Sequence, residues 1–191
     1  MVKVEALKQR LLEINPEVEI EAIQAIYSEE NALQFDLDSF DYVVDAIDSL
    51  QHKAALIMHA TRSNSKFFSS MGAALKIDPL KIEVAEFWKV RGCSLARALR
   101  QRFKKKKEFP AKKFLCVFSE ERLENKGSAT ACGTDKCVCP KTEKAPGDPD
   151  LANHEWCSSK ALINGSLMHI TAIFGLTLAG LIIKDIERNI K

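Results

Sequence analysis

The sequence has few glycines, and none of them forms the glycine-rich loop with which a nucleotide-binding α/β domain usually opens. Only 8 glycines occur in 191 residues. Such a loop cradles phosphate groups at the amino end of a helix, so its absence excludes a phosphate site of that type within these residues. The chain begins on a helix, as if a first strand, its glycine loop and the next strand were missing.

Other features that define a class of protein are also missing. Residues 1–6 start an amphipathic helix instead of an apolar leader, and no Ser/His/Asp set, paired C-x-x-C motif or internal repeat occurs. The net charge of +2 is too small to indicate a nucleic-acid partner by itself. Six cysteines without a leader favour a reducing compartment, so we expect a cytoplasmic protein.

The order of apolar patterns is typical of an α/β protein. Segments expected as strands are residues 18–22, 42–46, 66–70, 81–87 and 114–118. Segments expected as helices are residues 2–14, a short helix from 28, one after 49 through 61, and 95–106. Alternating helices and strands form parallel sheets with helices on their faces. We therefore predict part of a doubly wound, Rossmann-like parallel sheet in a domain of residues 1–120.

The sequence changes character beyond residue 120. Residues 121–157 have few large apolar side chains, which is typical of a long mobile loop. In residues 158–191, an apolar helix expected from Ala161 to Ile183 is long enough to span a bilayer. Polar residues interrupt its first half, so we expect a buried or dimer-interface helix, with His169 hydrogen-bonded in the core. A membrane-associated tail is the alternative.

One strand end carries the first candidate site residue. The expected strand 42–46 runs into Asp48 and Ser49 before the next helix. In an open α/β sheet, ligands bind beyond the carboxyl ends of the strands. Asp48 is therefore placed to meet a nucleotide, a metal or a polar substrate. A helix N-cap is the alternative, since Asp and Ser are favoured there.

A basic run begins in the expected helix 95–106 and continues beyond it. Its nine cations are Arg97, Arg100, Arg102, Lys104, Lys105, Lys106, Lys107, Lys112 and Lys113. Only Glu108 opposes them, and two phenylalanines are interleaved. Contact with a phosphate backbone is mostly electrostatic, so this run is a candidate nucleic-acid surface. A solvated helix face is the alternative.

The cysteines indicate two different environments. Four of them fall in the loop-rich segment: Cys132, Cys137, Cys139 and Cys157. Four thiolates can bind zinc, but the C-x4-C-x-C spacing strains a single tetrahedron, so free thiols are the alternative. Cys116 lies within an apolar strand pattern and is expected in the core.

Several separate motifs resemble the ThiF/MoeB/HesA superfamily of ATP-dependent enzymes. They are residues 3–16, ending in Asn-Pro, residues 42–49 around Asp48, and Lys-Ala-Ala-Leu-Ile at 53–57. Further motifs resemble the tRNA threonylcarbamoyladenosine dehydratase branch of that superfamily. These are Gly72-Ala-Ala, Ile77-Asp-Pro, Cys116-Val-Phe-Ser-Glu, Gly165-Ser and Thr171-Ala-Ile-Phe-Gly. The resemblance covers nearly the whole chain except residues 122–155.

The resemblance implies an enzyme that uses ATP to activate the carboxylate of threonylcarbamoyladenosine in tRNA, which then cyclises with loss of water. It also implies a doubly wound sheet, a C-terminal extension and a homodimer. By matching positions, Lys3 would contact the ATP phosphates and Asp48 would bind the accompanying Mg²⁺. Cys157 is the weak catalytic candidate, because related activating enzymes carry a thioester cysteine near this position.

The chain also departs from the family pattern. The family's glycine-rich loop, ribose-binding acidic residue and adenine pocket all lie upstream of Lys3, and Phe87-Trp-Lys-Val replaces a polar run. We therefore expect a truncated form with weak ATP binding. The alternatives are a sulfur-carrier adenylyltransferase of the same superfamily, with a sulfur-transfer protein as partner, and a non-catalytic remnant that binds tRNA or protein.

Overall fold

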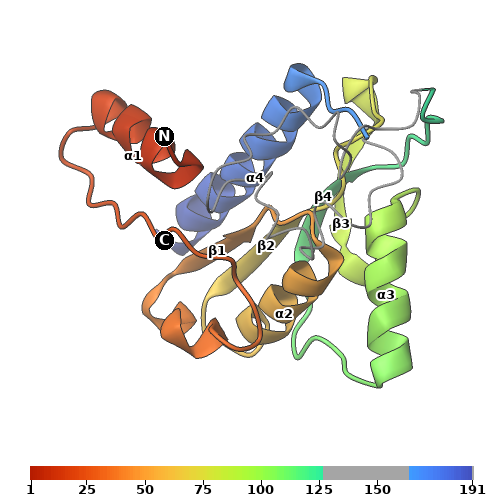
Figure 1. The fold of residues 1–191 in the computed structure, drawn as a ribbon, viewed down its shortest axis with the longest axis horizontal. Coiled ribbons are helices and arrows are strands. Elements are labelled where there is room, and N and C mark those ends of the chain that lie inside the picture. The colour runs from red at the N-terminus through yellow and green to blue at the C-terminus, as the bar shows by residue number, and fades with distance from the viewer. Residues whose placement is uncertain (127–163, 191) are drawn as a thin grey trace, which may run out of the picture.

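The computed structural model describes residues 1–126 and 164–190, and a four-stranded sheet forms the centre of their fold (Figure 1). The strands are β1 (Tyr42–Asp45), β2 (Lys66–Ser70), β3 (Ile82–Glu86) and β4 (Leu115–Ser119). Their order is β1-β2-β4-β3, in which β1, β2 and β4 are parallel and β3 is antiparallel to β4. The predicted α/β class is confirmed, although the β3 edge departs from a purely parallel sheet.

Four α-helices and four short 3-10 helices accompany the sheet. The α-helices are α1 (Lys3–Ile14), α2 (Leu50–Ala60), α3 (Ser94–Lys106) and α4 (Met168–Asn189). The 3-10 helices are η1 (Ala32–Gln34), η2 (Leu37–Ser39), η3 (Pro79–Lys81) and η4 (Phe87–Lys89). These counts apply to the described ranges alone. The expected helices 2–14 and 95–106 are confirmed, with boundaries within one residue.

Different helices cover the two faces of the sheet, because neighbouring residues of a strand point to opposite sides. Phe67 of β2 belongs to the core cluster that contains Ile57 of α2 and Leu99 of α3. Phe68, the next residue, belongs to a second cluster with Phe174 of α4. The sheet is therefore a middle layer, with α2 and α3 on one face and α4 on the other (Figure 1).

Two expected segments have a different structure. Residues 18–22 have no regular secondary structure, and Val18 is 37% exposed. Their alternating pattern has no layer against which to bury its apolar side. The short helix expected from residue 28 is replaced by turns and by η1 and η2. Most of the predicted loop 121–157, with its four cysteines, lies outside the described residues.

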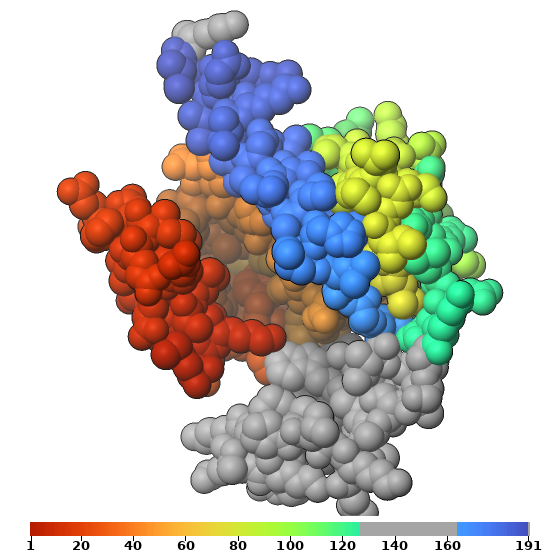
Figure 2. All heavy atoms as spheres, turned by 90° about the horizontal axis from the view of Figure 1, so that it is seen from above, coloured from red at the N-terminus to blue at the C-terminus, as the bar shows by residue number. Residues whose placement is uncertain are grey.

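Only one side of α4 is buried. Ile170, Phe174 and Leu178 pack against the sheet, whereas Leu176 is 71% exposed and Ile183 is 66% exposed. Figure 2 shows α4 lying on the outer surface in blue. By length and composition alone α4 could also cross a bilayer, but here it contacts β2 and β4. The C-terminal helix is thus buried on one face alone, and its described start is Met168 and not Ala161.

His169 does not occupy the core position expected for it. Its side chain is exposed, and Nε2 lies 3.1 Å from the carbonyl oxygen of Ile77. The position is set by the helix start, since His169 is the second residue of α4 and lies before the first buried turn.

A substitution at Gly92, in the turn before α3, tests how tightly the backbone is packed there. Its φ is +69°, and a Cβ there would overlap the backbone of Glu120. Both effects penalise any other residue, so we expect Gly92→Ala to lower the free energy of unfolding by about 2 kcal/mol or more. Urea denaturation measures the change.

Gly180→Ala is the matched control, since a Cβ at this helical position meets nothing within 4 Å among the described residues. Alanine favours helix over glycine by about 1 kcal/mol, so this variant should be neutral or more stable. Equal losses for the two variants would show that the Gly92 turn is not constrained.

Candidate functional site

A cavity of about 620 Å³ lies at the carboxyl ends of β1 and β2. This is the end of an open parallel sheet at which ligands usually bind. Segments far apart in the sequence line it: residues 46–48, 70–76, 94–95, 164 and 166, and 171–178 in part. The separate motifs that carry the family resemblance, at Asp48, Gly72-Ala-Ala, Ser166 and Thr171–Gly175, therefore meet in one place.

A buried ion pair lies directly beneath this cavity. Nζ of Lys53, on α2, is 2.6 Å from Oδ2 of Asp45, the last residue of β1, and both side chains are 0% exposed. The hydroxyl of Ser69 on β2 donates to the same carboxylate oxygen at 2.6 Å. The other oxygen, Oδ1, accepts the backbone amide of Ile47 at 2.9 Å. The charges are thus paired and the carboxylate is hydrogen-bonded on both oxygens, as buried charges require.

Lys53 also ties two strand ends together. Its ammonium donates to the carbonyl of Ile47 at 3.0 Å and to that of Ser70 at 2.7 Å. Both carbonyls belong to segments that line the cavity. The path of the chain that presents Asp48 is therefore fixed by hydrogen bonds on either side of it.

Asp48 itself faces the cavity and is exposed. The N-cap of α2 is Ser49, so Asp48 precedes the helix and is not its cap residue. An exposed carboxylate beside a cavity suits Mg²⁺, which proteins often bind through one or two carboxylates together with substrate phosphates. In the described part of the chain, no three His, Cys, Asp or Glu side chains are grouped for metal binding. Asp48 would therefore supply one carboxylate ligand to a metal whose other ligands come from phosphates.

A second buried carboxylate, that of Glu121, holds the segment that follows the cavity residue Lys76. Oε2 of Glu121 accepts the backbone amides of Ile77 at 2.7 Å and Asp78 at 3.1 Å. These amides, that of Asp78 first, hold the pKa of the Glu121 carboxyl below its ordinary value of 4.5. Nζ of Lys76, a residue of the cavity wall, donates to the Glu121 carbonyl at 2.6 Å, and burial lowers the pKa of this ammonium.

The remaining predicted residues lie elsewhere. Lys3 is exposed on α1, which buries none of its residues, and it does not line the cavity. Lys3 as a phosphate contact stays a prediction, as does Mg²⁺ binding by Asp48. Cys157 lies outside the described residues. Cys116 is fully buried and burial raises the pKa of its thiol, which confirms the expected core position.

The basic run lies on α3 and after it. Arg97 and the four lysines at 104–107 are exposed. Arg100 instead donates to the carbonyl of Phe87 at 3.1 Å and lies over that ring, 5.9 Å from its centroid. This cation therefore supports η4. The role of the run in binding tRNA stays a prediction.

Known proteins share both the sequence and the fold. Residues 1–189 match the ThiF family. The chain belongs to the ThiF family. It is 29% identical to the Bacillus subtilis tRNA threonylcarbamoyladenosine dehydratase, over 99% of this chain and 67% of that protein. It is 32% identical to the Escherichia coli dehydratase, over 92% of this chain and 62% of that protein. The predicted resemblance to this branch is confirmed.

Solved structures of the Escherichia coli dehydratase agree with the arrangement of this ThiF-family chain. The complex with AMP superposes with a TM-score of 0.71 at 26% identity, over 99% of this chain and 65% of that one. The complex with ATP gives a TM-score of 0.58 at 33% identity, over 64% and 53%. The chain spans about two thirds of the length of these relatives.

Sequence reasoning missed the residues that organise the site. Asp45 and Lys53 lie within the motifs that carry the family resemblance, which implies no role for them, and Glu121 lies in the segment predicted as a loop. A signal existed for Lys53, because it is the one charged residue at the start of the apolar run Lys53–Ile57. A lysine on the buried side of a helix needs a carboxylate partner, and Asp45 ends the preceding strand.

The buried pair predicts a large loss of stability when it is broken. We expect Lys53→Met or Asp45→Asn to lower the free energy of unfolding by about 3–5 kcal/mol, because each leaves an unpaired buried group. The double variant should lose less than the sum of the single losses. Urea denaturation of the four proteins measures this cycle, and additive losses would contradict the coupling.

The lowered pKa of Glu121 makes the free energy of unfolding depend on pH in a specific way. Its pKa is lowered in the folded state, so it stabilises the fold above its unfolded pKa, near 4.5, and the contribution is lost as pH falls through the folded pKa. Wild type should therefore be more stable than Glu121→Gln at pH 7, and the difference should shrink at pH 3. A pH-independent difference in urea midpoints would contradict this cause.

Proposed function

We propose that this chain takes part in the ATP-dependent dehydration of threonylcarbamoyladenosine in tRNA, with its cavity holding one part of the nucleotide site. The observation that carries the proposal is the meeting of Asp48, Gly72-Ala-Ala, Ser166 and Thr171–Gly175 in one cavity at the carboxyl ends of parallel strands. Two relatives that match nearly the whole chain are named tRNA threonylcarbamoyladenosine dehydratase. Solved structures of such a dehydratase contain AMP or ATP.

The chemistry suits an exposed aspartate at this place. When the substrate carboxylate attacks the α-phosphorus of ATP, negative charge on the phosphates has to be neutralised. Asp48 would hold the Mg²⁺ that supplies this neutralisation, and the Lys53–Asp45 pair would keep the Asp48 segment in position. The attack would release pyrophosphate and leave an acyl adenylate. A nucleophilic atom of the substrate would then bond to the activated carbonyl carbon and lose its proton, and AMP would leave with the former carboxylate oxygen, so that the substrate has lost the elements of water.

We also propose that ATP binding by these 191 residues alone is weak. Among the described residues that line the cavity, Lys76 is the one cation, and its ammonium already donates to the Glu121 carbonyl. Asp48 is the one carboxylate there, so the lining has no excess positive charge for a triphosphate. The enzyme would act in the cytoplasm as a homodimer, and the exposed side of α4 supports such an assembly.

A titration with Mg-ATP tests the nucleotide site. We expect a Kd above about 100 µM, equivalent to about −5.5 kcal/mol, with NMR shifts confined to residues 46–48, 70–76 and 166–178. Asp48→Asn should remove the dependence of binding on Mg²⁺. Asp41→Asn, at the other end of β1, is the control for the loss of one carboxylate and should retain it.

Two results would contradict the proposal. A low-micromolar Kd would show that the chain binds ATP strongly by itself. Shifts outside the cavity, or Mg²⁺ dependence that survives in Asp48→Asn, would remove Asp48 from the site. Mass analysis of tRNA nucleosides after deletion of the gene tests the activity itself, because loss of the dehydrated nucleoside is the expected result.

A further inference from the structure

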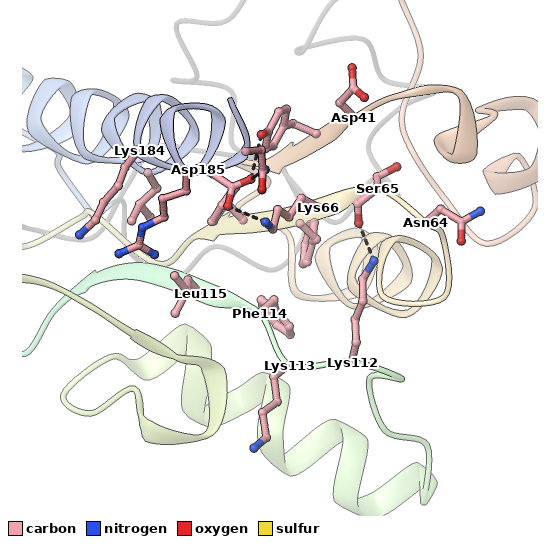
Figure 3. Close-up of a pocket in the computed structure, with 16 residues that line it drawn as sticks. Asp41, Asn64, Ser65, Lys66, Lys112, Lys113, Phe114, Leu115, Lys184 and Asp185 are labelled. Atoms are coloured by element: carbon pink, nitrogen blue, oxygen red, sulfur yellow. Dashed lines mark hydrogen bonds and ion pairs between the residues drawn. The ribbon is translucent and has the colours of Figure 1, made fainter. Parts of the chain in front are cut away.

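A second hollow, of about 700 Å³, lies at the opposite end of the sheet from the cavity, beside the amino ends of β1, β2 and β4 (Figure 3). We call it the basic groove. Its cations come from three separate places in the chain, which are β2, the segment before β4, and α4: Lys66, Lys112, Lys113, Lys184 and Arg188. Two carboxylates, those of Asp41 and Asp185, also line it, which leaves an excess of three positive charges.

The acidic residue at the centre of the groove is already neutralised. Asp185 on α4 forms an ion pair with Lys66 of β2 and accepts the hydroxyl of Tyr42 at 2.8 Å. These two contacts, that of Lys66 first, hold the pKa of the Asp185 carboxyl below its usual range. They fix α4 against the sheet, and with it the positions of Lys184 and Arg188 on either side of Asp185 along the helix.

Three cations of the groove remain available to a ligand. Lys113, Lys184 and Arg188 are exposed, and no hydrogen bond or ion pair engages them within the described residues. Lys112 differs, because its ammonium donates to the carbonyls of Ser63 and Ser65. In Figure 3, Lys113 and Lys184 come from different elements on either side of Leu115 and Phe114.

The lining of the groove fits a polyanion better than an acidic protein. Protein interfaces usually have an apolar centre. Here three phenylalanines of the lining, Phe67, Phe68 and Phe114, are at most 5% exposed, whereas Tyr42 is half-buried and Leu115 is 37% exposed. The polar side chains of Asn64, Ser65 and Asn189 complete the wall. An excess of cations with polar side chains between them is typical of a surface that binds a phosphate backbone.

The groove also lies at the same end of the sheet as the basic end of α3. The segment 107–114 connects the carboxyl end of α3 to the amino end of β4, and β4 is parallel to β1 and β2. Lys104–Lys107 and the groove therefore share one end of the molecule. Together they extend the positive surface beyond the length of a single phosphate group.

We propose that the basic groove binds the phosphodiester backbone of tRNA through Lys113, Lys184 and Arg188, as a docking surface separate from the cavity. The inference rests on the proposed function, which supplies the RNA substrate. Backbone contacts position a nucleic acid without reading its sequence, so the groove would hold the body of the tRNA while the modified base reaches the other end of the sheet.

The test is fluorescence anisotropy with labelled tRNA at several salt concentrations. The variant Lys113→Ala/Lys184→Ala/Arg188→Ala leaves Lys66 and Asp185 in place, so the attachment of α4 is kept. We expect the Kd to rise about tenfold or more, and the slope of log K against log salt to fall by about 3. Thermal unfolding should be unchanged, and so should Mg-ATP binding at the cavity.

Arg10→Ala/Lys81→Ala/Lys126→Ala is the charge-matched control, because these three exposed cations lie outside the groove. Its Kd should stay within about twofold, since a general effect of net charge is weak at physiological salt. A second comparison combines Lys104–Lys107→Ala with the groove variant. If both regions contact one RNA, the combined variant should bind tRNA more weakly than the groove variant alone.

Each outcome has a distinct meaning. If wild type binds tRNA and the groove variant binds it equally, with the same salt slope, the groove is not a docking surface and the proposed function stands. If wild type does not bind tRNA, the RNA substrate of the proposed function fails as well. If poly-L-glutamate binds as tightly as tRNA and loses as much in the groove variant, the ligand is an acidic protein and the inference is overturned.

Discussion

The buried ion pair between Asp45 and Lys53 links the fold of this chain to its candidate site. An unpaired charge at either position would be costly, so β1 and α2 can pack together only when the two side chains meet. The pair also places hydrogen bonds on Ile47 and Ser70, where β1 and β2 end. The same contacts thus hold the core together and shape the floor of the cavity.

The two ends of the sheet have different electrostatic character. At the carboxyl end, the cavity lining carries Asp48 and an engaged Lys76, so its charges nearly balance. At the amino end, the basic groove and the end of α3 concentrate positive charge. A net charge of +2 conceals this difference, because an average over the chain contains no information about position.

The sequence predicted the local elements well, because their signals are local. The apolar runs of β2 and β4 and the helical spacing of α1 and α3 each depend on neighbours in the chain. The antiparallel direction of β3 could not be predicted, since alternation is the same in both directions. The prediction for residues 18–22 was wrong for a related reason: their pattern is that of a strand, but no strand in the described part of the chain pairs with them.

The candidate site was predicted in part. Asp48 and the glycine and threonine motifs could be identified because they are contiguous segments with a recognisable resemblance. The Glu121 contacts join residues more than forty positions apart, and the groove collects cations from three places, so neither has a local signature. Local patterns do not show which distant segments the topology brings together.

The attachment of α4 has a consequence for how the chain folds. The bond between Tyr42 and Asp185 closes a separation of 143 residues, and the second core cluster is complete only when α4 covers Phe68 and Val117. Such non-local contacts slow folding, because the loop entropy is lost before the contacts form. During synthesis, one face of the sheet would stay uncovered until α4 leaves the ribosome, and in that interval a chaperone could bind it.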